Sequence, residues 1–118
     1  MPITLDQTTG ARLLTPDDDE LALTVTLRYV GADPLAVHFV FPPWISLDGE
    51  EVTWTFARAL LEDGLGTPAG LGTVHIRAAD PSHTAVEVGT PAGVQLPLFH
   101  TPLLRPLLMA SHQIPEPR

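Results

Sequence analysis

The chain has 118 residues, no cysteine and no lysine, and its six arginines stand against fourteen acidic residues, giving a formal net charge of -8. The absence of cysteine excludes disulfides, thiol nucleophiles and cysteine-based zinc sites. The acidic balance argues against nucleic-acid binding, because contact with a phosphate backbone needs a patch of basic side chains. A chain of this length is expected to form one domain, residues 1–118, with its own hydrophobic core.

The start of the chain shows neither the basic segment nor the apolar stretch of a secretion signal, so a cytoplasmic location is expected. The longest uncharged stretches, 35–47 and 88–104, are interrupted by proline or polar residues. A membrane-spanning helix needs about 20 predominantly apolar residues, so no span is predicted.

The first predicted elements are an acidic turn and two strands. The cluster Thr15–Glu20 is expected to be a solvated turn or a single helical turn capped by Thr15, since three adjacent aspartates lack the spacing of a calcium loop. Residues 21–29 alternate apolar and polar side chains, which is the clearest strand pattern in the sequence. The turn 31–34 then leads into a second strand, Leu35–Phe41, and so short a connection favours antiparallel pairing.

A third strand and a helix are predicted next. After the Asp48-Gly49 turn, Val52–Phe56 alternates and places two aromatic side chains on one face. Apolar residues then recur at helical spacing over Ala57–Asp63, and Gly64 is expected to end this short helix in a left-handed cap.

The third quarter of the chain is expected to hold a loop followed by further strands. Glycine and proline mark 64–72 as a loop, and Thr73–Ala78 and Thr84–Val88 are predicted as strands around a turn at Asp80–His83. Apolar side chains alternate again at positions 94, 96 and 98. In total, the sequence predicts an α+β fold with an antiparallel sheet of about six strands, one helix in mid-chain and one helix at the end.

The predicted C-terminal helix covers Thr101–His112 and has leucines at helical spacing. Proline is tolerated only in the first turn of a helix, so this helix is expected either to begin at Arg105-Pro106 or to be kinked there. Residues 113–118 are expected to fray. The leucines are expected to pack on the sheet, on another subunit, or on both, and the candidates for an oligomer interface are Leu103, Leu104, Leu107 and Leu108.

No arrangement of residues predicts catalysis, a cofactor or a metal. Asp80, Ser82 and His83 are of the types found in a catalytic triad, but they crowd one loop, where turn chemistry explains them. The paired glycines match no nucleotide-binding spacing. The five histidines share no metal-ligand spacing and fall in different elements: His38, His75, His83, His100 and His112. We therefore expect a protein that is not an enzyme.

The sequence resembles the SsgA-like family of sporulation and cell-division proteins of actinobacteria. Four segments carry the resemblance. Two are specific, LRY followed by ADPLAVH at 27–38 and VTWTFARALL with a following GL at 52–65, and two match more loosely, GTVHI at 72–76 and the turn TPAG at 90–93. Their order and spacing hold from about Leu21 to Met109. Two departures are Arg77, where the family usually has tryptophan, and Pro106 in an unusually apolar terminal helix.

The resemblance implies a whirly-like fold, trimeric assembly and a non-enzymatic cytoplasmic protein that acts at division septa, with FtsZ or SsgA-like paralogues as partners. Asp33, Arg58 and Glu62 are the candidate partner-binding residues from motif position. Each also has a structural interpretation, since Asp33 can cap a turn and Arg58 can pair with Glu62 four residues on. The alternatives are a nucleic-acid-binding module inherited with the fold and a small ligand-binding protein.

Overall fold

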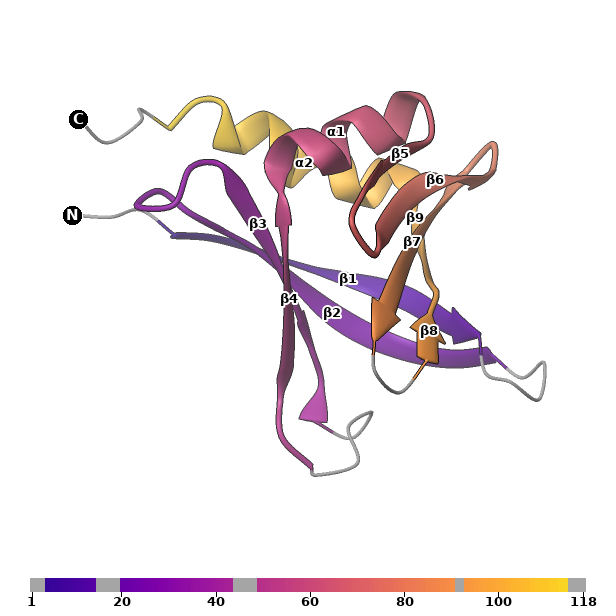
Figure 1. The fold of residues 1–118 in the computed structure, drawn as a ribbon. Coiled ribbons are helices and arrows are strands. Elements are labelled where there is room, and N and C mark those ends of the chain that lie inside the picture. Colours follow the sequence, from indigo (N-terminus) through magenta and orange to yellow (C-terminus); the bar gives the residue numbers. More distant parts are fainter. Residues whose placement is uncertain (1–3, 15–19, 44–48, 91–92, 115–118) are drawn as a thin grey trace.

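The computed structural model describes residues 4–14, 20–43, 49–90 and 93–114, and Figure 1 shows their arrangement. In chain order the elements are β1 (Thr4–Leu14), β2 (Glu20–Val30), β3 (Ala36–Phe41), β4 (Val52–Ala57), α1 (Arg58–Gly66), β5 (Ala69–Leu71), β6 (Val74–Asp80), β7 (His83–Thr90), β8 (Gly93–Gln95), β9 (Pro97–His100) and α2 (Thr101–Ser111). The predicted acidic turn lies outside the described residues apart from Glu20, which begins β2.

The strands form one antiparallel sheet in the order β4-β3-β2-β1-β9-β7-β6-β5, with β8 paired to β7. The sheet is strongly curled, and both helices lie together on one side of it (Figure 1). α1 follows β4 directly and packs on β5 and β6, so it connects the two ends of the strand order. The α+β class and the antiparallel sheet are confirmed. The predicted number of about six strands is wrong, since the described residues form nine.

The long strand β1 was not predicted, although it pairs with β2 along its whole length. Its side chains alternate in burial, but the three central inward positions hold polar or small residues, since Thr9 and Ala11 are buried and Gln7 is half-buried. Apolar inward side chains occur only near its ends, at Leu5 and Leu13. A pattern based on hydrophobicity cannot detect such a strand. The Gln7 side-chain amide donates a hydrogen bond to the Leu103 carbonyl, which connects β1 to the first turn of α2.

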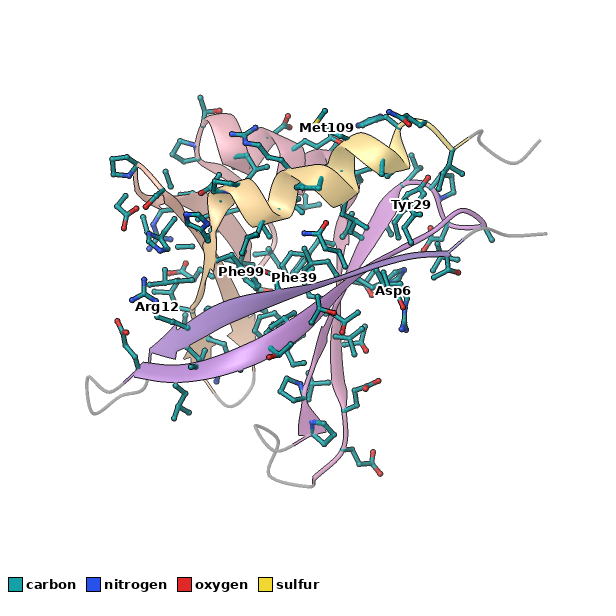
Figure 2. All side chains as sticks on the ribbon, turned by 180° about the vertical axis from the view of Figure 1, so that it is seen from behind. Asp6, Arg12, Tyr29, Phe39, Phe99 and Met109 are labelled. Carbon is teal, nitrogen blue, oxygen red and sulfur yellow. The ribbon has the colours of Figure 1, made fainter. Side chains whose placement is uncertain are left out.

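The predicted strands at 21–29 and 35–41 are confirmed as β2 and β3, and they carry the centre of the core. The ring of Phe39 meets those of Phe56 and Phe99 edge to face, with centroids 5.1 and 5.2 Å apart. Phe39 and Phe99 both lie beneath α2 (Figure 2). Because Phe56 belongs to β4 and Phe99 to β9, this aromatic cluster joins strands from both halves of the sheet. The two aromatics expected on one face of β4 are also confirmed, and the Trp54 ring lies 4.4 Å from that of Phe41, tilted by 55°.

The mid-chain helix is confirmed, but its predicted end at Gly64 is wrong. α1 continues to Gly66, and Gly64 is a buried helical residue whose φ is not positive. A Cβ atom placed on Gly64 would stand 2.4 Å from Ile76 Cγ2. The glycine therefore permits close packing of α1 on β6, and it does not form a left-handed cap.

Two details of the second half also differ from prediction. The segment 64–72, predicted as a loop, contains the last turn of α1 and the short strand β5. The alternation at 94, 96 and 98 does not mark one strand with an apolar inner face, because Val94 is 66% exposed and the buried residues are Pro97 and Phe99. The predicted strands at 73–78 and 84–88 are confirmed as β6 and β7.

The C-terminal helix begins at Thr101 and runs through Pro106. Of the two predicted alternatives, a start at Arg105 is therefore wrong. Pro106 has no N–H to donate to the carbonyl four residues earlier. After the helix, Ile114 donates its backbone N–H to the Ser111 carbonyl and packs against the core, while 115–118 lie outside the described residues.

Candidate functional site

Arg58, the first residue of α1, lies where the two helices meet β2. Its guanidinium carbon is 5.5 Å from the centre of the Tyr29 ring, and its Nη1 donates a hydrogen bond to Ser111 Oγ at 3.3 Å. Its Nε is 3.7 Å from Glu62 Oε1, as the i,i+4 spacing predicts. Only 12% of the Arg58 side chain is exposed. This arginine therefore connects α1, α2 and β2 from within.

Glu62 also connects the two helices. Its Oε1 accepts a hydrogen bond from Nε2 of His112, just after α2, at 2.6 Å. The Glu62 carboxylate is therefore paired on two sides, with Arg58 on its own helix and with His112 on the neighbouring segment. The same carboxylate lines a hollow of about 250 Å³ between the helices, together with Leu65, Arg105, Leu108, Met109 and His112.

Asp33 lies in the turn between β2 and β3. Its backbone N–H donates to the Val30 carbonyl at 2.9 Å, which confirms the predicted turn, and its Oδ2 is 3.8 Å from His38 Nε2. The next residue but one, Leu35, is 71% exposed, and its carbonyl accepts the Arg58 backbone N–H at 2.8 Å. The structure thus brings this turn beside the start of α1, although among the described residues Asp33 forms its ion pair with His38 and Arg58 forms its own with Glu62.

The four leucines considered for an oligomer interface do not share one environment. Leu104, Leu107 and Leu108 are buried in the chain's own core, whereas Leu103 is 41% exposed. Met109 is 67% exposed and points away from the sheet (Figure 2). Leu103 and Met109 are therefore the large hydrophobic side chains that α2 leaves exposed, beside its two exposed prolines.

The family model described as "Streptomyces sporulation and cell division protein, SsgA" matches residues 23–116. The chain belongs to the SsgA family. The resemblance carried by the sequence motifs is thereby confirmed, and the shared segment contains every candidate partner-binding residue described above.

Named relatives within the SsgA family agree with this assignment. The chain is 47% identical over 75 residues to sporulation-specific cell division protein SsgB of Salinispora tropica, covering 64% of this chain and 52% of the relative. It is 38% identical over 97 residues to SsgB of Saccharopolyspora erythraea, covering 77% and 64% respectively. The matched segment thus spans about half to two thirds of these relatives.

Solved structures of SsgA-family proteins share the fold. One comes from work on mutations in SsgB that correlate to longitudinal cell division during sporulation of Streptomyces coelicolor. This structure matches with a TM-score of 0.83 and 29% sequence identity, and the match covers 96% of this chain and 89% of that chain. The SsgA-like sporulation-specific cell division protein of Thermobifida fusca has a TM-score of 0.82 at 25% identity, over 94% and 81%.

The Asp80–His83 turn of this SsgA-family chain is a closed hydrogen-bonded unit. His83 Nδ1 lies 2.9 Å from Asp80 Oδ1, and the Ser82 hydroxyl and backbone N–H also donate to that oxygen. These hydrogen bonds, chiefly the one from His83, lower the pKa of Asp80 to about 2. On the other side of the ring, Arg12 donates to His83 Nε2 at 3.1 Å. Ser82 and Asp80 therefore both contact Nδ1 of His83, while Arg12 contacts Nε2. In a catalytic triad the serine and the aspartate contact different nitrogens of the histidine, so this arrangement is not that of a triad.

We looked in the described part of this SsgA-family chain for groups that could bind a metal, a membrane or a phosphate. It holds no group of three or more metal-ligating side chains. Neither described helix has the length and apolar character needed to cross a membrane. Four of its five arginines lie within ion-pair distance of a carboxylate: Arg12, Arg28, Arg58 and Arg77. The fifth, Arg105, has no carboxylate within that distance among residues 4–14, 20–43, 49–90 and 93–114.

Only part of the contact between α1 and the end of α2 can be predicted from the sequence. The pairing of Arg58 with Glu62 follows from their spacing, but Ser111 and His112 lie about fifty residues further along the chain. No local pattern connects residues that far apart. The position of the Arg58 guanidinium over the Tyr29 ring likewise depends on where the start of α1 lies relative to β2, which the sequence does not specify.

Proposed function

We propose that this chain is a non-enzymatic regulator of sporulation and cell division that assists septum formation through protein contacts, with FtsZ or SsgA-like paralogues as partners. The observation that carries the proposal is membership of the SsgA family over residues 23–116. The relatives are named as sporulation-specific cell division proteins. Action in the cytoplasm at division septa is part of the proposal.

A role without catalysis agrees with the way polar groups are used. Within the described residues, Arg58 and Glu62 are occupied by contacts that hold the helices together. Asp80, Ser82 and His83 satisfy one another within their turn. General acid–base and nucleophilic catalysis need groups that face a substrate, whereas these groups face each other.

The surface near the start of α1 is our proposed contact region for a division protein. Asp33 has 58% of its side chain exposed and lies close in sequence to the exposed Leu35. Glu62 is about one third exposed, while Arg58 supports this region from beneath. The proposed roles therefore differ: Asp33 and Glu62 touch the partner, and Arg58 positions α1.

Self-association is also proposed, with a trimer as the expected form. Among the leucines of α2, Leu103 is the one available for it, because the other three pack in the core. Light scattering of the purified chain measures the mass directly. A mass of 12.7 kDa, that of one chain, at all concentrations would contradict this part of the proposal.

The main test uses purified FtsZ and SsgA-like paralogues from the same organism. Immobilised full-length chain is expected to capture at least one of them, and the Asp33→Arg variant is expected to capture less. Asp63→Arg serves as the matched control, since that side chain is exposed and makes no side-chain hydrogen bond in the described structure. Failure to capture any of these proteins, together with normal septa after gene disruption, would contradict the function.

A further inference from the structure

The outer side of α2 pairs a cation with an apolar side chain one helical turn away. Arg105 is exposed, and Met109, four residues on, is 67% exposed. Residues four apart lie on the same face of a helix. Met109 points away from the sheet (Figure 2), whereas Leu104 and Leu107 of the same helix are buried in the core.

Between these residues and α1 runs the hollow of about 250 Å³, which we call the interhelix groove. Its α1 side is formed by Glu62 and Leu65, and its α2 side by Arg105 and Met109. The volume is below the roughly 300–1,000 Å³ typical of small-molecule sites. A groove of this size instead suits one or two side chains of a bound segment.

The two charged side chains at the groove differ in whether they already have a partner. The Glu62 carboxylate already binds His112 at 2.6 Å and lies 3.7 Å from Arg58. Arg105 is the one arginine in the described part of the chain with no carboxylate within ion-pair distance. The protein has a net charge of -8, but this unpaired guanidinium attracts negative charge locally. It therefore favours binding of a carboxylate from another molecule at the groove.

We propose that the interhelix groove binds a short segment of a protein partner that carries an acidic residue beside a bulky apolar one. The carboxylate pairs with the Arg105 guanidinium, which offers two parallel N–H donors. The apolar side chain enters the hollow against Leu65 and Met109, whose flexible thioether adapts to varied shapes. This inference rests on the proposed function and names a docking site for it.

The observations favour a protein segment over the other occupants. A nucleic acid would meet a single unpaired cation, and phosphate contacts need several. A second copy of the chain would need to bury about 800 Å² per partner. Of the residues that line the groove, Met109 is the only large apolar side chain that is exposed, which is little surface for such an interface.

A synthetic peptide tests the groove directly. The probe is an acetylated, amidated peptide of sequence Ser-Asp-Asp-Leu-Phe-Gly, added to the full-length chain and followed by backbone amide chemical shifts. We expect shift changes confined to residues around Leu65, Arg105, Met109 and His112. A matched peptide with both aspartates replaced by asparagine should bind at least tenfold more weakly.

Variants separate charge from packing. Arg105→Glu should weaken peptide binding at least tenfold, Arg105→Lys should retain part of it, and Met109→Glu should also weaken it. Arg77→Glu is the matched control, since Arg77 is partly exposed but lies 3.8 Å from Glu87 and outside the groove; it should bind as the wild type does. Far-ultraviolet circular dichroism confirms that each variant is folded.

Four results would overturn the proposal. These are no shift change at millimolar peptide, changes centred elsewhere, equal binding of the asparagine peptide, or shifts at the groove that depend on protein concentration without peptide, which would show a second copy there. Failure of the proposed function is distinguishable. If wild type captures a division protein and Arg105→Glu captures it equally, the groove proposal fails alone. If no division protein binds but the peptide does so through Arg105, the function fails and the groove stands.

Discussion

Gly64 of α1 lies so close to Ile76 of β6 that a Cβ atom on the glycine would stand 2.4 Å from Ile76 Cγ2 and 3.0 Å from its carbonyl oxygen. Ile76 itself is completely buried. This contact fixes how closely α1 approaches the sheet, and α1 in turn presents Glu62 and Leu65 to the groove. The position of the proposed docking site therefore depends on the absence of one side chain.

Gly64→Ala is expected to destabilise the protein by about 1–3 kcal/mol, the usual cost of overpacking a closely packed core. Urea denaturation measures the change. Gly66→Ala is the matched control, because it ends the same helix and a Cβ atom there would meet nothing within 4 Å. Alanine at that position should leave stability unchanged or raise it by up to about 1 kcal/mol. Equal stability of the two variants would contradict the close contact.

Tyr29→Phe is expected to leave stability unchanged or to increase it slightly. The Tyr29 hydroxyl is buried and makes no hydrogen bond to the described residues. A buried polar group without a partner costs free energy, so its removal is favourable or neutral. The phenylalanine ring still receives the Arg58 guanidinium. A thermal melt measures the change.

Tyr29→Ala is the comparison for this prediction. Loss of the whole buried ring should cost about 3–5 kcal/mol, as for other large aromatic truncations. A loss of 1 kcal/mol or more in Tyr29→Phe would show that the hydroxyl is hydrogen-bonded in solution.

Strands with an apolar inner face can be predicted from the sequence. Elements whose position depends on pairing or packing with a distant segment cannot be predicted in this way. β2 and β4 were predictable because their hydrophobic side chains alternate. β1 was not, because its inward face carries Gln7 and Thr9 and its pairing depends on β2. The sequence predicts Gly64 as a cap because glycine commonly ends helices, whereas in the structure this glycine permits the close approach of Ile76.

The candidate site was predictable to the same limited extent. Local spacing predicts that Arg58 and Glu62 pair, and the structure confirms it. The contribution of His112 and Ser111 depends on where α2 ends relative to α1. Such long-range contacts arise from packing between elements, and one sequence contains no periodic signal for them.

The Glu62–His112 contact is expected to contribute only modestly to stability, despite its length of 2.6 Å. Both side chains are partly exposed, at 34% and 52%. Exposed pairs typically contribute about 0.2–1 kcal/mol, because solvent screens them. A double-mutant cycle of Glu62→Gln and His112→Gln at pH 7 measures this coupling. A coupling near zero would show that the two helices are held by Arg58 and the leucines alone.

Asp80 should make the protein's stability depend on pH in acid. Its pKa is lowered to about 2, chiefly by the hydrogen bond from His83 and then by that from the Ser82 backbone N–H. In the unfolded chain an aspartate titrates near pH 4. A carboxyl whose pKa is lower in the folded state adds stability that is present above the unfolded value and is lost as the pH falls towards the folded one. The contribution of Asp80 should therefore disappear between about pH 4 and pH 2.

Asp80→Asn removes this titration while keeping an oxygen that accepts the Ser82 N–H. The variant should be less stable than wild type at pH 7, and its free energy of unfolding should fall less steeply between pH 4 and pH 2. Some slope should remain, because the hydrogen bond from Arg28 also lowers the pKa of Asp6. Asp63→Asn is the control, since that exposed side chain makes no hydrogen bond in the described structure. Identical pH profiles for the two variants would show that the turn does not hold Asp80 ionised.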